Sequence, residues 1–309
     1  MKNILFEWSP SIDVTGDSLR TEKTILPCQD AEGNAYLLKG EVQDRQEVER
    51  ICAFTNQLNL VIPTPFYEKM DSSHYTVERN HVVYTLERKL IGEEIEEVSD
   101  THLTEIATAL GTMHRFSLKN QLQLNRGTTW SLFGGNASEE LGDYDENEVS
   151  FWECRDAFSE HPLFREVEAA YHHIRQDLQN IWSELPLAAT QGDFCYYNMV
   201  FENDKLTGLF DFNLAGDEVL INECLAVAVY HSWHAPYQGI LSPEERFTLF
   251  CDAYQRIRPW TEKESSVVPQ LKALIRAFRY DRIEAGIKAN QPDVFLKETL
   301  QLLREADTH

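Results

Sequence analysis

Short apolar runs separated by turn residues open the chain, and longer stretches with helical spacing follow. Thr24–Pro27 and Ala35–Lys39 flank the polar segment Glu32–Asn34, a pattern that predicts a β-hairpin. Gln43–Leu58 repeats its apolar residues at helical spacing and predicts a helix. Two more strands are predicted at Tyr75–Val77 and Val82–Leu86. This order predicts an antiparallel sheet that carries one helix.

Helical patterns dominate the rest of the chain. Ser99–Asp100 has the residue types of a helix N-cap, and the apolar spacing continues through His114. Further helices are predicted at Pro162–Leu185, Leu220–Tyr237, Glu244–Arg256, Glu264–Ala289 and Pro292–Ala306. We therefore expect an α+β fold with a small β-rich N-lobe, residues 1–88, and a larger, mainly helical C-lobe, residues 89–309.

The least regular region of the sequence is Asn120–His161. It contains Gly134–Gly135, the acidic run Glu139–Glu148, and then the aromatic pair Phe151–Trp152. An exposed loop or insertion is the favoured interpretation. A lid that faces a substrate is the alternative, because long loops often carry function.

The charge balance argues against nucleic acid as a partner. The chain has 51 acidic and 28 basic residues, and the formal net charge of -23 would repel a phosphate backbone. The same negative field would favour a cationic substrate, although a solvated acidic surface gives the same composition.

Cysteine usage and hydropathy predict a protein of the cytoplasm. The six cysteines include no C-x-x-C pair, so neither a zinc cluster nor a disulfide framework is expected. The first residues lack the apolar core of a signal peptide, and no apolar run approaches the length of a membrane span. The sequence leaves the oligomeric state open.

The strongest chemical signal lies in the segment Gln191–Phe212. Asp193 is followed five residues later by Asn198, and Asp211 follows a predicted hairpin made by 199–201 and 206–210. Phosphoryl transfer needs a group that orients the attacking hydroxyl and oxygen ligands for magnesium. We predict that Asp193 accepts the proton of the substrate hydroxyl and that Asn198 and Asp211, brought together by the hairpin, hold the metal.

This segment resembles the aminoglycoside phosphotransferase and choline kinase superfamily, whose fold is like that of protein kinases. The superfamily pattern is H-G-D-x-x-x-x-N followed by D-F or D-W, and Asp193, Asn198 and Asp211 match it. Leu110–His114 resembles the helix that precedes the catalytic loop in the superfamily. Gln191 stands where the superfamily has His, and a Gln can still hydrogen-bond the loop backbone. The resemblance implies ATP and Mg²⁺ as cofactors and a small-molecule hydroxyl compound as substrate.

The resemblance extends to the predicted N-lobe. Lys39 ends a strand similar to the V-L-K strand of the superfamily, which implies an ion pair with the nucleotide phosphates. The acidic partner expected for this lysine on the following helix is Glu47, with Glu49 as the alternative. A solvated strand-end lysine and an exposed helix carboxylate remain the competing interpretations.

Two further nucleotide contacts are implied, and their sequence signals are weaker. The segment Thr15–Ser18 has one glycine where protein kinases have several, so Ser18 is the expected phosphate contact. The segment Tyr84–Glu93 resembles the superfamily hinge, where the backbone of Glu87 and Arg88 would meet adenine.

The C-terminal half is similar to one branch, the type II homoserine kinases. Ala253–Glu264 resembles the branch signature A-Y-x-x-x-R-P-L-T-x-x-E, a marker of fold more than a substrate contact. Asn213–Asp217 and Glu223–Ala226 depart from the branch. Homoserine is therefore one hypothesis beside amino alcohols, aminoglycosides, sugars and small amino acids.

Acidic and aromatic residues after Phe212 are candidates for binding an ammonium group. Asp217, Glu218, Glu223 and the acidic run could supply the negative charge, and Tyr230 and Trp233 could stack on the cation. Packing within the core or along a helix is the favoured interpretation of the two aromatic residues.

Other classes of function fit the sequence less well. A kinase-like protein that binds nucleotide without turnover is the main alternative, motivated by Gln191 and the sparse phosphate loop. A hydrolase would need a G-x-S-x-G elbow, and a protein kinase would show H-R-D and D-F-G; neither set of motifs occurs. His172–His173 is an adjacent pair and does not have the spacing of a metal-ligand set.

Overall fold

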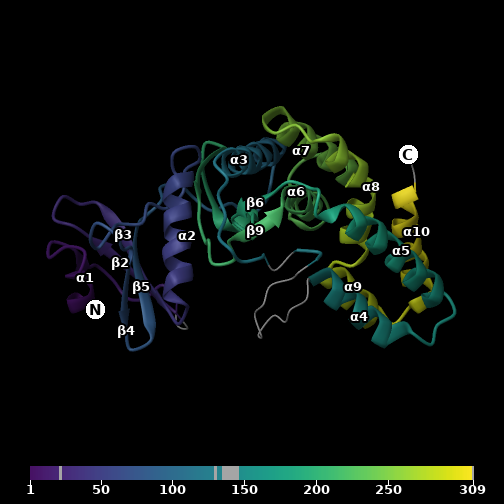
Figure 1. Ribbon diagram of the computed structural model, residues 1–309, viewed down its shortest axis with the longest axis horizontal. Helices are drawn as coiled ribbons and strands as arrows, with labels where there is room; N and C mark the ends of the chain where they lie inside the picture. Colours follow the sequence, from purple (N-terminus) through teal and green to yellow (C-terminus); the bar gives the residue numbers. More distant parts are fainter. Residues whose placement is uncertain (21–22, 129–130, 134–145, 308–309) are drawn as a thin grey trace. The chain divides into compact units, whose positions relative to one another are not determined.

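The computed structural model describes residues 1–20, 23–128, 131–133 and 146–307. The chain divides into two compact units, one of Met1–Glu96 with Tyr196–Asn213 and the other of Glu97–Cys195 with Leu214–His309 (Figure 1). The first unit holds an antiparallel sheet and the second is mainly helical, which confirms the predicted α+β class. Gly134–Gly135 and residues 139–145 of the acidic run lie outside the described residues.

The sheet of the first unit has the strand order β1-β2-β3-β5-β4, and each neighbouring pair is antiparallel. The predicted hairpin forms between β2 and β3, because Asp30 Oδ1 accepts the N–H groups of Glu32 and Asn34 in the turn. Lys39 lies opposite Ile25 on one side and Thr85 on the other, so its backbone is held from both neighbouring strands. The strands are β1 (Asp13–Val14), β2 (Thr24–Gln29), β3 (Ala35–Glu41), β4 (Thr76–Arg79) and β5 (Val82–Arg88).

Helix α2 (Arg45–Leu58) follows β3, where the apolar spacing predicted a helix. Asp44 caps its first turn, because the Asp44 side chain accepts the N–H of Glu47 at 2.9 Å. Ile51, Phe54 and Leu58 are buried, as the helical spacing requires.

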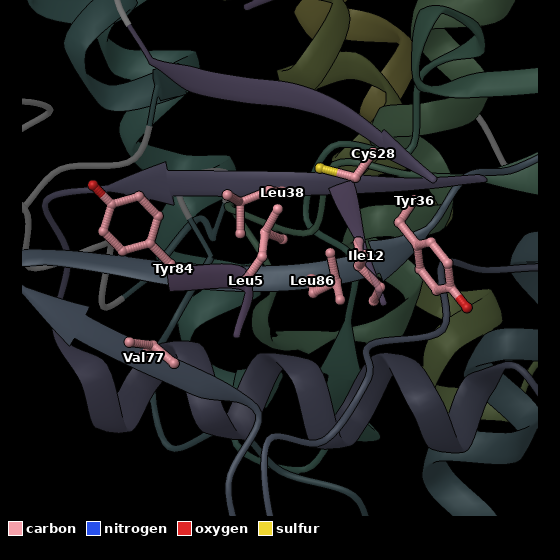
Figure 2. Close-up of a cluster of buried hydrophobic side chains, with 8 residues drawn as sticks. All are labelled: Leu5, Ile12, Cys28, Tyr36, Leu38, Val77, Tyr84 and Leu86. Atoms are coloured by element: carbon pink, nitrogen blue, oxygen red, sulfur yellow. The ribbon is translucent and has the colours of Figure 1, made fainter. Parts of the chain in front are cut away.

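One face of the sheet is covered by the N-terminal segment. Side chains alternate between the two faces of a strand, so Leu38 and Leu86 lie on one face while Lys39 points to the other. Leu5, from the short helix α1 (Lys2–Leu5), and Ile12 pack on the first face in the cluster of Figure 2. The full buried set is Leu5, Ile12, Cys28, Tyr36, Leu38, Val77, Tyr84 and Leu86. The apolar cluster thus lies on one face of the sheet, and the Lys39 side chain lies on the other.

The hairpin of β7 (Met199–Glu202) and β8 (Lys205–Leu209) belongs to the first unit. It forms backbone hydrogen bonds with the preceding chain, from Leu209 N–H to the Pro63 carbonyl and in both directions between Phe201 and Glu93. The predicted boundary at residues 88 and 89 therefore differs from the observed division. Sequence order alone could not assign residues 196–213 to the N-terminal unit.

The second unit is built from helices around the short antiparallel strand pair of β6 (Leu187–Thr190) and β9 (Gly216–Val219). Ser99 caps α3 and accepts the N–H of His102, as the sequence predicted. The α-helices are α3 (Asp100–Lys119), α4 (Glu146–Phe158), α5 (Phe164–Trp182), α6 (Leu220–Val229), α7 (Pro243–Ile257), α8 (Glu262–Ala277), α9 (Tyr280–Ala289) and α10 (Pro292–Arg304), and a π-helical turn at Tyr230–His234 follows α6. No helix within the described ranges is long and apolar enough to cross a membrane.

Two sequence predictions in this unit were wrong. Glu264–Ala289 is not one helix, because α8 ends before the fully buried Phe278 and α9 begins at Tyr280. The supposed loop Asn120–His161 contains α4, whose Phe151 stacks on Tyr171 with ring centroids 3.8 Å apart. In both cases the packing of an aromatic side chain overrides the local pattern.

We expect that Leu38→Ala lowers the free energy of unfolding by about 2–5 kcal/mol, since a fully buried side chain leaves a cavity. Urea denaturation followed by circular dichroism measures this change. Leu60→Ala is the matched control, because Leu60 is 78% exposed and its truncation should cost little. Equal losses for the two variants would contradict the assignment of Leu38 to the core of the sheet.

Candidate active site

Gly192 sits where the backbone has a conformation that other residues rarely adopt. Its φ is +83°, in the left-handed region that favours glycine. A Cβ atom built on Gly192 would lie 2.0 Å from the carbonyl oxygen of Leu214, so a side chain cannot fit without moving the backbone. The loop that carries Asp193 therefore packs directly against the segment that leads into β9.

Gln191 holds the same loop from inside the second unit. It is fully buried, and its Oε1 accepts the N–H of Asp193 at 2.8 Å. The Asp193 carbonyl in turn accepts the N–H of Cys195 at 2.8 Å. The expectation that a glutamine can hydrogen-bond the loop backbone is confirmed. The side chain that replaces the superfamily histidine thus still supports the backbone of Asp193.

Glu223 lies on α6 and supports the loop from the other side. It is 4% exposed, its Oε1 accepts the Gly192 N–H at 3.2 Å, and its Oε2 lies 2.6 Å from His114 Nε2. Each carboxylate oxygen thus has a partner within the protein. The sequence predicted Glu223 as an ammonium ligand, whereas this geometry supports a role in positioning the loop.

Asp217 is also engaged with the backbone. Its Oδ1 accepts the Leu124 N–H at 2.7 Å and its Oδ2 accepts the Asn125 N–H at 2.8 Å. The Asp217 N–H donates to the Arg126 carbonyl, which joins the chain after α3 to β9. The carboxylate predicted to bind substrate thus fixes the segment 124–126.

Glu218, also predicted as an ammonium ligand, is a buried carboxyl group next to Asp217. Burial raises its pKa to about 8, against the opposing effect of hydrogen bonds from the Thr128 hydroxyl and the Val219 N–H. The nearby Glu223 carboxylate raises the pKa of Glu218 further. Glu218 is therefore mostly protonated at neutral pH.

Lys39 forms an ion pair within the first unit. Its Nζ lies 2.8 Å from Oε1 of Glu87, a residue of β5 that is almost fully buried. Burial alone would lower the pKa of Lys39, but Glu87 and the more distant Asp211 raise it above its usual value. Lys39 therefore carries a positive charge at neutral pH on the face of the sheet opposite the N-terminal segment.

The expected ion pair of Lys39 with Glu47 is not the one that forms. The partner is Glu87, whose side chain shares the Lys39 face of the sheet because residues 85 and 87 alternate with 86. The alternative, Glu49, binds β4 instead, since its carboxylate accepts the N–H groups of Tyr75 and Thr76. The acid beside the lysine thus comes from a strand and not from the helix.

Asn198 and Asp211 lie at the two ends of the β7–β8 hairpin. The Phe210 N–H donates to the Asn198 carbonyl at 2.9 Å, so the hairpin folds the Asp211 end back to Asn198 as its spacing predicted. Asp211 has φ +59°, and Phe212 beside it is buried and contacts Phe54 with ring centroids 6.2 Å apart. Asp211 is exposed, so its carboxylate is accessible to a ligand.

The other predicted nucleotide contacts are more weakly supported. Ser18 Oγ donates to the carbonyls of Arg20 and Lys23, so it closes a turn of its own segment. The Arg88 N–H donates to the Phe66 carbonyl at 2.9 Å and the Lys89 N–H to the Ala35 carbonyl at 3.0 Å. The backbone N–H groups of Arg88 and Lys89 are therefore engaged within the protein.

Tyr230 and Trp233 contact cations of the protein itself. The Arg276 guanidinium carbon lies 4.2 Å from the Trp233 ring centroid, and that of Arg279 lies 5.0 Å from the Tyr230 centroid. These contacts agree with the packing interpretation of the two rings. In the described parts of the chain, no group of three or more His, Cys, Asp or Glu residues is arranged to hold a metal by itself.

Comparison with known proteins identifies a family. The model described as the phosphotransferase enzyme family matches residues 38–260. A homoserine kinase from Polaromonas naphthalenivorans (strain CJ2) is 32% identical over 102 residues, which are 32% of this chain and 30% of that protein. The chain thus covers less than a third of the length of this relative.

Solved structures of kinases share the fold. A microcompartment-associated aminopropanol kinase matches with a TM-score of 0.61 and 13% identity, over 99% of this chain and 94% of that one. An amicoumacin kinase in complex with AMP-PNP and Ca²⁺ matches with a TM-score of 0.60 and 12% identity, over 96% and 88% of the two chains. An aminoglycoside phosphotransferase from Alicyclobacillus acidocaldarius matches with a TM-score of 0.59 and 12% identity, over 100% and 97%. The predicted protein kinase-like fold is confirmed.

The raised pKa of Glu218 predicts a specific dependence of stability on pH. The folded chain retains a proton at Glu218 that the unfolded chain loses, so the free energy of unfolding should fall as pH rises from about 4.5 to about 8. Glu218→Gln should remove this part of the decrease, because the amide does not titrate. Urea denaturation across this pH range measures the effect.

The exposed Glu202 supplies the control for this experiment, and Glu202→Gln should leave the pH dependence of stability unchanged. An identical pH slope in wild type and Glu218→Gln would show that Glu218 is not held in its protonated form.

Proposed function

The chain belongs to the phosphotransferase enzyme family, and we propose that it transfers the γ-phosphoryl group of ATP to the hydroxyl group of a small molecule. The observation that carries the proposal is the loop at Gly192, because its contacts hold the backbone of Asp193. Asn198 follows Asp193 by five residues in the sequence. The fold shared with an amicoumacin kinase bound to AMP-PNP supports ATP as the donor.

In this proposal Asp193 orients the acceptor and takes up its proton. The acceptor oxygen forms a bond to the γ-phosphorus while the bond from that phosphorus to the β–γ bridging oxygen breaks, and ADP leaves. The hydroxyl proton passes to the Asp193 carboxylate. Gln191 contributes by holding the Asp193 N–H, which limits the movement of the base.

Asn198 and Asp211 are the residues that we propose to hold Mg²⁺. An amide oxygen and a carboxylate are hard oxygen donors, and magnesium in phosphoryl-transfer sites commonly takes only one or two protein ligands beside phosphate oxygens. The exposed Asp211 carboxylate fits this requirement. When bound, the metal would neutralise charge that develops on the transferred phosphoryl group.

Lys39 is the cation that we propose for the nucleotide phosphates. Its raised pKa keeps it charged, and Glu87 restrains its ammonium group on one face of the sheet. Glu87 is thus the ion-pair partner of Lys39, a role that the sequence predicted for Glu47. Ser18 and the backbone near Arg88 contribute less to the proposal, because both already form hydrogen bonds within the protein.

The acceptor that we propose is a small amino alcohol. The homoserine kinase relative and the aminopropanol kinase are named for acceptors that carry both a hydroxyl and an amino group. The formal charge of -23 favours the approach of an amino alcohol that carries a net positive charge. Homoserine, aminopropanol, choline and aminoglycosides therefore form the first panel to test, and the cytoplasm is the compartment in which we expect the reaction.

Nucleotide binding without transfer is the second candidate, and Gln191 in place of the superfamily histidine is the observation that favours it. Stabilisation by ATP would be observed under both proposals. Formation of ADP that depends on an acceptor would occur only under the first.

Asp193→Asn should lower kcat by about 10²–10⁴-fold, because the amide cannot take up the hydroxyl proton. Its ATP affinity should remain close to that of wild type. Coupled ADP release with the acceptor panel measures kcat, and thermal stabilisation by Mg-ATP measures binding. Asp204→Asn, in the exposed turn of the neighbouring hairpin, is the matched control and should keep full activity. Wild-type turnover in Asp193→Asn would refute the assigned base.

A further inference from the structure

We infer that the segment Ala253–Glu264 positions the catalytic loop through a directional chain of hydrogen bonds. The chain runs from Arg258 through Tyr254 and His114 to Glu223, which holds the N–H of Gly192. This inference rests on the proposed function, because it assigns positioning residues to the loop that carries Asp193. Tyr254, Arg258 and Glu264 belong to a sequence signature that otherwise has no assigned role.

Each link of the chain is short and buried. Arg258 Nη1 lies 3.0 Å from the Tyr254 hydroxyl, which lies 2.7 Å from His114 Nδ1. His114 Nε2 lies 2.6 Å from Glu223 Oε2. Tyr254 and His114 are fully buried, so water cannot replace a partner that is removed. The chain connects α7, α3 and α6 before it reaches the loop.

The chain of hydrogen bonds begins at a buried ion pair, on the side away from Gly192. Arg258 Nη2 donates to Glu264 Oε1 at 2.7 Å, and Glu264 Oε2 accepts the Thr261 N–H at 2.9 Å. Glu264 is fully buried and also belongs to the capping box of α8. The ion pair holds the guanidinium group in place, so Arg258 presents an N–H to Tyr254 in one fixed direction.

The donors and acceptors permit one arrangement of protons. Arginine has no acceptor, so the Tyr254 oxygen must accept from Arg258 and its own proton must point to His114 Nδ1. His114 Nδ1 then accepts, and Nε2 carries the proton that is donated to Glu223. The remaining oxygen of Glu223 accepts the Gly192 N–H. The Glu223 carboxylate can only accept, so it and the Arg258–Tyr254 pair together favour the Nε2–H tautomer of His114.

The electrostatics of the chain agree with this arrangement. Burial lowers the pKa of His114, against the opposing effect of Glu223, so the ring is neutral at neutral pH. Burial also raises the pKa of Tyr254, so its hydroxyl keeps the proton that it donates. The opposite tautomer of His114 would direct a nitrogen lone pair at the Glu223 carboxylate, which would repel it and weaken its hold on Gly192.

Tyr254→Phe tests the inference, because it removes the donor to His114 Nδ1 and keeps the ring. We expect ¹⁵N NMR to show the neutral Nε2–H tautomer of His114 in both proteins, because Glu223 still accepts the Nε2 proton, and a shifted Nδ1 resonance in the variant, where Nδ1 has lost its donor. Hydrogen exchange of the Gly192 N–H should become at least about tenfold faster. With an active acceptor, kcat should fall by about tenfold or more while KM for ATP changes little.

Tyr171→Phe is the matched control, since it removes a buried tyrosine hydroxyl of the same unit that is outside this chain of residues. Arg258→Lys and Arg258→Gln give a second test that does not depend on Tyr254. Lysine has no acceptor and should leave the Tyr254 proton directed at His114 Nδ1, whereas the glutamine oxygen can accept that proton and should shift the Nδ1 resonance as Tyr254→Phe does.

Unchanged hydrogen exchange of the Gly192 N–H in Tyr254→Phe would overturn the inference. The NMR and exchange measurements require no substrate. A wild-type protein without turnover would therefore contradict the proposed function and leave this test intact.

Discussion

The close approach of Gly192 to Leu214 is the constraint on which the proposed active site depends. A backbone with φ +83° and no room for a Cβ can follow one path, and that path sets the direction of Asp193. Gln191 and Glu223 then hold the N–H groups of Asp193 and Gly192. These contacts thereby restrain the backbone that carries the proposed base.

Acidic side chains of the second unit form hydrogen bonds within the protein. Asp217 binds two N–H groups of the segment after α3, Glu223 binds Gly192, and Glu264 binds Arg258. Each of these carboxylates therefore joins its own element to another part of the chain. The acidity of the chain thus has a structural component within the fold, in addition to any effect on a cationic substrate.

The sequence predicted the elements whose signals are local. The cap at Ser99 and the hairpin between Asn198 and Asp211 each depend on residues a few positions apart. Glu87 as the partner of Lys39 and Glu223 as a support of Gly192 depend on tertiary packing. A charged residue is usually exposed, so the sequence predicts that it is available to a ligand. Only the structure shows that Glu87 and Glu223 are buried and bind groups of the protein itself.

The kinetics of Gly192→Ala test the central claim most directly. We expect kcat to fall by about 10²-fold or more, with the fold and ATP affinity retained, because the Cβ displaces the loop from Leu214. Gly33→Ala is the matched control, since Gly33 also has positive φ but its Cβ would meet no atom closer than 3.7 Å. Wild-type kcat in Gly192→Ala would contradict the account.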